Sequence, residues 1–240
     1  MTDDASDPAR TTLRHRLATE LGDEALATRV AAALDDAVTA RLLTRTGADR
    51  GGADLVSYSP ARVADDEVDS LWVLAFGYRL AAGPVAGDEG IPPMSALEPG
   101  PVNEALAHAA ASFVARRPVP IIAQWEVARV LDTLNVDGVV SVEPDHSSDG
   151  SVVYLSTADV IAKGLRLAAE AGVDVGFAGV VGHADHAPRA VLTAIAAGLD
   201  AAVPEGIRLP ADYDPESGQP WTRSREAFVP VDLMARAFTA

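Results

Sequence analysis

The sequence predicts an α/β protein with a mainly parallel sheet of about five strands, covered by helices on both faces in three layers. Short apolar runs typical of buried strands recur at residues 71–77, 119–124, 138–143, 173–182 and 199–204. Segments with helical periodicity separate these runs. Parallel strands are buried on both faces and need crossover helices, so this alternation is typical of βαβ units.

Each predicted strand is followed by a predicted helix, because apolar residues recur there at helical spacing. These helices are expected at residues 102–117, 125–135, 156–172, 186–198 and about 222–238. The third opens with Ser156-x-x-Asp159, the spacing of a capping box. Residues 83–101 are rich in Pro and Gly, which predicts a long loop that is a candidate lid.

The chain before the first strong strand predicts a helical extension. Residues 1 to about 10 are expected to be disordered, and residues 11–46 are rich in Ala and Leu without Pro. The spacing predicts two amphipathic helices, broken around Gly22-Asp23. The predicted domains are therefore residues 1–68, a helical extension, and residues 69–240, the α/β domain.

The amino-acid composition limits the classes of binding partner and the cellular compartment that we expect for this protein. The formal net charge of −16 disfavours nucleic acid and anionic membranes, since both attract basic surfaces. The absence of Cys excludes disulfides, thiolate metal sites and a Cys nucleophile. No apolar run is long enough to span a membrane. We therefore expect a cytoplasmic protein with a small-molecule ligand, in an oligomeric state that the sequence leaves open.

Candidate binding residues follow the predicted strands, because open parallel sheets bind ligands at the carboxyl ends of their strands. Gly77 permits close backbone approach, and Arg79 suits an anion. Glu126, in the first turn of a helix, is either stabilised there by the helix dipole or accepts a hydrogen bond from a ligand.

The segment Gly182–Arg189, "GHADHAPR", carries three interpretations. His183, Asp185 and His186 are candidate metal ligands. Alternatively, an imidazole and the Arg189 guanidinium at a helix start grip a carboxylate or phosphate. In the third interpretation, Asp185 only caps the helix and Arg189 faces solvent.

The pattern His186-x-x-Arg189, with Pro188 before the arginine and Ala190 after it, resembles a motif of the YdcF/SanA/ElyC-like family. The resemblance covers roughly residues 70–238 and implies a Rossmann-like domain. It aligns Glu126 and Thr157 with two further family motifs, and Asn103 opens a helix at the corresponding place. His183 and Asp185 stand where this chain departs from the family pattern, so both are candidates for tuning the substrate. The resemblance also implies S-adenosylmethionine or a nucleotide as a candidate cofactor.

The leading hypothesis is an enzyme, a transferase or hydrolase, acting on an anionic metabolite that is nucleotide-like, adenosyl-like or a carboxylate. His186 is the candidate acid or base, and Glu126 is its candidate acidic partner. The candidate substrate-binding residues are Arg189, Arg79, Gly77, Asn103, Thr157, His183 and Asp185. The alternatives are a non-catalytic binding or regulatory module, and a metal-dependent hydrolase that uses His183, Asp185 and His186. In the leading hypothesis no metal is bound.

Overall fold

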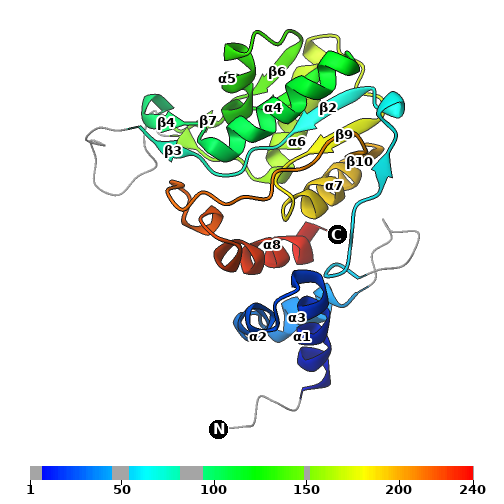
Figure 1. The fold of residues 1–240 in the computed structure, drawn as a ribbon, viewed down its shortest axis with the longest axis vertical. Helices are drawn as coiled ribbons and strands as arrows, with labels where there is room; N and C mark the ends of the chain where they lie inside the picture. The colour runs from blue at the N-terminus through cyan, green and yellow to red at the C-terminus, as the bar shows by residue number, and fades with distance from the viewer. Residues whose placement is uncertain (1–6, 45–53, 82–93, 149–151, 240) are drawn as a thin grey trace. The chain divides into compact units, whose positions relative to one another are not determined.

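A computed structural model describes residues 7–44, 54–81, 94–148 and 152–239 of the chain. The chain forms two compact units: an α/β unit, Pro60–Arg223, and a helical unit made of Met1–Ser59 and Ser224–Ala240 (Figure 1). The helices are α1 (Pro8–Leu21), α2 (Glu24–Ala33), α3 (Asp36–Leu42), α4 (Pro101–Arg116), α5 (Trp125–Thr133), α6 (Thr157–Glu170), α7 (Ala187–Ala196) and α8 (Arg225–Thr239). The strands are β1 (Arg62–Val63), β2 (Ser70–Val73), β3 (Arg79–Leu80), β4 (Leu97–Glu98), β5 (Ile121–Gln124), β6 (Val139–Val142), β7 (Asp145–His146), β8 (Val152–Val153), β9 (Ala178–Val181) and β10 (Ala201–Pro204). Short 3-10 helices lie at Asp65–Glu67, Met94–Ala96 and Pro220–Thr222.

The central sheet has six strands in the order β1-β10-β9-β2-β5-β6, and every pair is parallel. Apart from β1, the strands in chain order are β2, β5, β6, β9 and β10. Read across the sheet from β6 to β10, they stand in the order third, second, first, fourth, fifth. That is the doubly wound Rossmann order, so the predicted fold class is confirmed, with one additional edge strand, β1. The chain order reverses between β2 and β9.

Helices cover both faces of this sheet, which gives three layers (Figure 1). α4 and α5 pack together on one face, and α6 and α7 pack together on the other. β2 lies at the centre and is therefore buried on both faces: Leu71 and Val73 point one way, and Trp72 the other. This two-sided burial explains why the strand reads as a continuous apolar run.

The close approach of α6 to the sheet depends on Gly164. A Cβ atom at this position would lie 2.7 Å from Cζ3 of Trp72 and 2.9 Å from Cγ2 of Ile122. Real Cβ atoms do not approach other atoms so closely, so a larger residue would push the helix away from β2 and β5. Gly164 thus sets the spacing between one helical layer and the middle of the sheet.

We predict that Gly164→Val lowers the free energy of unfolding by about 1–3 kcal/mol, the usual cost of overpacking a core. Chemical denaturation monitored by Trp fluorescence measures the loss. Ala162→Val is the matched control, since Ala162 is exposed on the same helix and should change stability by less than about 0.5 kcal/mol. Equal stability of the two variants would contradict the proposed role of Gly164.

The helical unit consists of α1, α2 and α3 together with α8. Asp7, Asp23 and Asp35 each precede one of the first three helices, and each side chain accepts a backbone N–H as an N-cap. α8 packs against α2 and α3, and Arg41 Nη1 donates to the carbonyl of Ala237 at 3.1 Å. The apolar face of α8 thus completes a core that three helices alone leave open.

The division of the chain differs from the predicted domains of residues 1–68 and 69–240. The first boundary lies at Ser59, and α8 belongs to the helical unit and not to the α/β unit. The reason is a set of long-range contacts, such as the hydrogen bond from Arg225 Nη1 to the Leu21 carbonyl at 2.9 Å. Local sequence patterns carry no information about such contacts.

Several element boundaries also differ from prediction. The N-terminal region holds three helices where two were predicted, because a second helix break occurs at Leu34 and Asp35. α1 begins at Pro8, within the stretch that was expected to be disordered, and residues 1–6 lie outside the described residues. Residues 83–93 of the predicted lid also lie outside them, and residues 94–101 form a 3-10 helix, β4 and the start of α4. Within the described ranges, no helix is long and apolar enough to cross a bilayer.

Candidate functional site

The candidate site lies at the carboxyl edge of the sheet, where β2 and β9 are neighbours and the chain order reverses. In doubly wound sheets the crevice at this point is the usual place for a ligand. The segment after β2 brings Phe76, Gly77 and Tyr78 to this edge, and the segment after β9 brings His183 and His186. Gly77 and His186, each predicted to follow a strand, follow β2 and β9, and these two strands are neighbours in the sheet.

Asn103 on α4 holds the segment after β2 in place. Its Oδ1 accepts the N–H of Phe76 at 2.8 Å, and its Nδ2 donates to the carbonyls of Gly77 and Pro99 at 2.8 and 2.6 Å. The side chain is fully buried, and these three hydrogen bonds join its amide group to the protein backbone. Asn103, predicted to bind substrate, lies at the edge as a support for the backbone.

An aromatic and histidine cluster fills the junction of β2 and β9. Phe76 stacks on His183, with ring centroids 4.0 Å apart, and Tyr213 packs edge-on against both rings. His186 is 5% exposed, and its ring centroid lies 6.5 Å from that of Phe76. Burial lowers the pKa of His183, although the nearby Asp185 carboxylate opposes this shift. His183 is therefore neutral near pH 7.

Asp185 is held by partners other than α7. Its carboxylate accepts the hydroxyl of Tyr213 at 2.7 Å, and its backbone N–H donates to Nδ1 of His183 at 3.2 Å. The N-cap of α7 is His186, which makes no side-chain capping bond. Within the described part of the chain, no group of three or more His, Asp or Glu residues is placed to share a metal ion.

Residues 205–223, here called the strap, connect β10 to α8 and contact the segment after β2. Arg79 forms a bidentate ion pair with Asp214, with both N–O distances 2.8 Å, and also contacts Glu216 at 2.9 Å. The backbone N–H of Gly218 donates to the carbonyl of Tyr78 at 2.7 Å. The charge of Arg79, predicted to bind an anionic substrate, is therefore balanced by two carboxylates of the strap.

Gly77 is required by the strap. Its φ of +75° favours glycine, and a Cβ atom there would lie 2.6 Å from the hydroxyl oxygens of both Ser217 and Thr222. The close approach predicted for Gly77 is thus made by the chain's own side chains. The strap also reaches the histidine cluster, where Tyr213 packs edge-on against His183.

We predict that Asp214→Asn loosens the strap and lowers the free energy of unfolding by about 1 kcal/mol at pH 7, since Arg79 is partly exposed. Arg79 holds the pKa of Asp214 below its usual range. The advantage of the wild type is therefore present above the ordinary pKa of Asp and is lost as the pH falls through the lowered value.

Faster hydrogen exchange at the Gly218 amide would report the loosening directly. Glu216→Gln is the matched control, because Glu216 contacts the same arginine but is 76% exposed. Unchanged exchange in Asp214→Asn would show that the ion pair does not hold the strap.

A buried carboxyl group forms a second cluster, after β5. Glu126 is fully buried in the first turn of α5, and the hydroxyl of Tyr154 donates a short hydrogen bond to its Oε1. Its Oε2 is buried without a hydrogen-bond partner among the described residues. Tyr78 stacks obliquely on Tyr154, with centroids 5.4 Å apart. A buried, half-satisfied carboxyl group is costly, which is a feature typical of functional sites.

Burial raises the pKa of Glu126 to about 8, although the hydrogen bond from Tyr154 opposes the shift. Glu126 is therefore mainly protonated at pH 7. The folded protein holds this proton up to about pH 8, whereas an unfolded chain releases it near the ordinary value of 4.5. Between these values the folded state binds more protons, so stability falls as the pH rises.

We predict that the free energy of unfolding of the wild type falls, relative to Glu126→Gln, by up to about 1.4 kcal/mol per pH unit between pH 5 and pH 8. Denaturation at a series of pH values measures the difference. Glu104→Gln, at an exposed first-turn position of α4, is the control and should parallel the wild type. Parallel curves for all three proteins would show that Glu126 ionises normally.

The starts of α6 and α7 meet through Arg189 and Thr157. Nη1 of Arg189 donates to the Thr157 hydroxyl at 2.6 Å. The predicted capping box is confirmed, since Ser156 and Asp159 each bond the other's backbone N–H. The structure thus brings two predicted substrate-binding residues together, with two helix N-termini.

The hydroxyl of Tyr154 donates to Oε1 of Glu126, and the pairing of Glu126 with His186 stays a prediction. Sequence reasoning missed Tyr154 and Tyr213, which contact predicted site residues. A signal was present: the chain has only 4 Tyr, and Tyr154 lies two residues before the predicted helix that starts at Ser156.

Comparison of the chain with family models, curated proteins and solved structures finds no match. The fold and the edge geometry define the class: a Rossmann-like α/β unit, inserted in a helical unit, with polar groups gathered at the carboxyl ends of the parallel strands.

Proposed function

We propose that this protein is an enzyme that acts on a small anionic metabolite at the carboxyl edge of its sheet, with Glu126 as the proton donor. The observation that carries the proposal is the buried Glu126 carboxyl group, with its raised pKa and an Oε2 that no described residue hydrogen-bonds. A general acid works best when its pKa is close to the operating pH. An ordinary surface glutamate is already ionised there and has no proton to donate.

The anionic group of the substrate is assigned to the junction of α6 and α7. Helix N-termini present backbone N–H groups and positive dipole ends, and Arg189 adds a full charge beside Thr157. Arg79 is left out of this role because Asp214 and Glu216 balance its charge. His186, buried at the start of α7, is the second proton-transfer group of the proposal.

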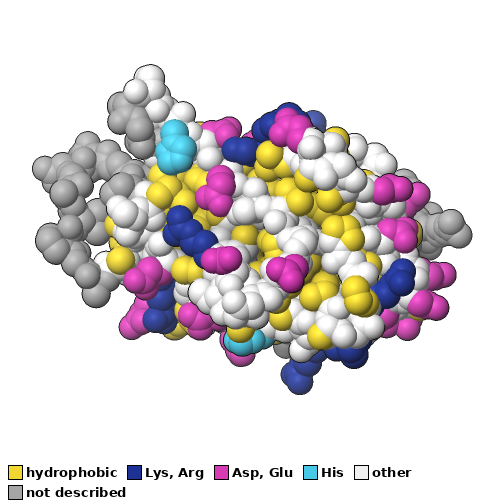
Figure 2. Space-filling view, turned by 90° about the horizontal axis from the view of Figure 1, so that it is seen from above, with side chains coloured by type: hydrophobic (Ala, Val, Ile, Leu, Met, Phe, Trp, Pro, Cys, Tyr) yellow, Lys and Arg dark blue, Asp and Glu magenta, His cyan; other side chains and the backbone are white. Residues whose placement is uncertain are grey.

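The surface charge supports a small ligand over nucleic acid. On the face viewed in Figure 2, acidic side chains are spread widely and basic ones stand singly or in small groups among them. A nucleic-acid surface would instead gather Lys and Arg in a stripe or patch. A nucleotide-like, adenosyl-like or carboxylate metabolite needs only a local cation and backbone donors, and a transferase or hydrolase reaction suits such substrates.

The test is a thermal-shift screen of nucleotides, adenosyl compounds and carboxylic acids, with mass spectrometry of each stabilising compound after incubation. We predict that Glu126→Gln lowers turnover by about 10²–10⁴-fold while the ligand still raises the melting temperature. Arg189→Met should instead abolish the ligand-induced shift. Glu104→Gln is the matched control and should behave as the wild type.

Two outcomes would contradict the proposal. Unchanged turnover in Glu126→Gln would remove the proton-donor role. A ligand that binds tightly and is recovered intact would favour a non-catalytic binding module at the same edge.

A further inference from the structure

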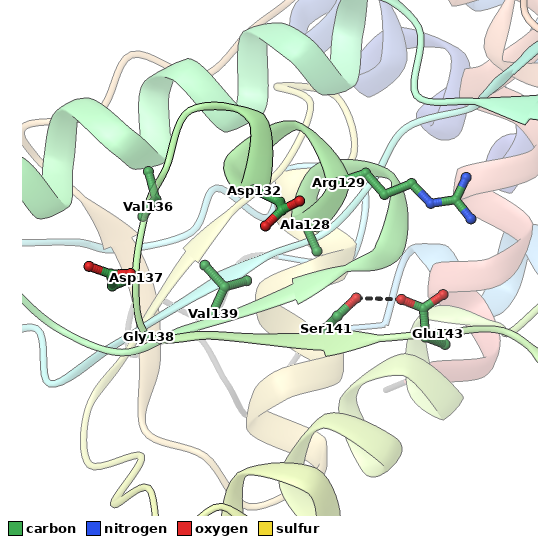
Figure 3. Close-up of a pocket in the computed structure, with 9 residues that line it drawn as sticks. All are labelled: Ala128, Arg129, Asp132, Val136, Asp137, Gly138, Val139, Ser141 and Glu143. Carbon is green, nitrogen blue, oxygen red and sulfur yellow. Dashed lines mark hydrogen bonds between the residues drawn. The ribbon is translucent and has the colours of Figure 1, made fainter.

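The outer edge of the sheet at β6 forms a groove that the proposed function does not use. A pocket of about 410 Å³ lies along α5, the turn 136–138 and β6 (Figure 3). Its apolar floor comes from Ala128, Val136 and Val139. Within the described ranges, β6 has a paired neighbour, β5, on one side only.

The register of β6 shows which of its backbone groups are open. Ile121 lies opposite Val139, and the N–H of Ile121 donates to the carbonyl of Gly138 at 3.1 Å. In a parallel ladder, a residue bonds to the two residues that flank its opposite number. Residues 138, 140 and 142 therefore bond toward β5, and the N–H and C=O groups of Val139 and Ser141 point outward. Both of these residues line the pocket.

The groove carries an excess of negative charge. Asp132, Asp137 and Glu143 line it, and no described residue pairs with the carboxylates of Asp132 or Asp137. Arg129 extends along α5 away from Asp132, and its guanidinium stacks on Trp125 at 4.4 Å and donates to the carbonyl of Leu97 (Figure 3). Glu143 accepts the hydroxyl of the nearby Ser141 at 2.7 Å.

We infer that this edge binds an extended basic peptide segment of another protein, which adds to the sheet as a strand beside β6. The open groups of Val139 and Ser141 supply the backbone bonds, and the three carboxylates receive Lys or Arg side chains. The negative charge of the groove favours a basic peptide over a second copy of the chain. A twofold β6–β6 contact would bring the carboxylates of Asp137 and Glu143 against those of the other copy.

The inference is independent of the catalytic proposal, because the groove residues are not its proton-transfer or anion-binding groups. The probe is a fluorescent peptide, acetyl-(Lys-Val)₃-Lys-amide, titrated with the full chain and followed by anisotropy. We predict saturable binding that weakens as salt rises, because the contacts are exposed ion pairs. The same peptide with Glu in place of Lys should not bind.

Two matched tests separate strand addition from charge attraction alone. The triple variant Asp132→Asn, Asp137→Asn, Glu143→Gln should weaken binding about tenfold or more, since each exposed pair contributes a few-fold. Asp200→Asn, at an exposed position between α7 and β10, is the control and should leave binding unchanged. A peptide N-methylated at alternate residues should lose about tenfold in affinity, because it cannot complete the backbone bonds.

Three results would overturn the inference: no saturable binding, equal binding by the N-methylated peptide, or equal weakening by Asp200→Asn. A concentration-dependent dimer in sedimentation that Ser141→Lys disperses would assign the edge to a second copy instead. Circular dichroism of each variant confirms that the fold is retained.

Discussion

The four residues 76–79, in the segment that follows β2, depend on the buried side-chain amide of Asn103. The amide fixes the backbone at Phe76 and Gly77, and each following side chain then organises a different part of the edge. Phe76 supports the histidine cluster, Tyr78 stacks on Tyr154, and Arg79 holds the strap. Because the bonds are buried, water cannot replace them cheaply if the amide is lost. The edge is therefore a single connected structure although its members come from distant parts of the chain.

Local patterns were sufficient to predict the sheet and the edge. The strands and crossover helices could be predicted because β2, β5 and β9 are buried on both faces, which leaves an unbroken apolar signature. The positions of Gly77, Glu126 and His186 at strand ends followed from the same reasoning. Ser156 and Asp159 could be identified as a cap because a capping box is defined by spacing alone.

What the sequence did not reveal depends on long-range contacts. The partner of Arg79 is Asp214, 135 residues away, so a cation that looked available for a ligand is balanced. Glu126 is hydrogen-bonded to Tyr154, which is 28 residues away in the sequence, and this contact determines the hydrogen-bond partner of the carboxyl group. α8 is amphipathic, and nothing in its own pattern tells which of two cores it completes. In each case the pairing could be identified only in the folded chain.

The placement of α8 has a consequence for synthesis on the ribosome. Residues 60–223 emerge between the first three helices and the helix that completes their core. Domains generally fold as they leave the ribosome, from the N-terminus onward. Here α1 to α3 are translated before the α/β unit and α8 is translated after it, so the core that α8 completes stays unfinished while residues 60–223 are made. Chaperones that recognise exposed apolar helices would therefore meet α1 to α3 before α8 is made.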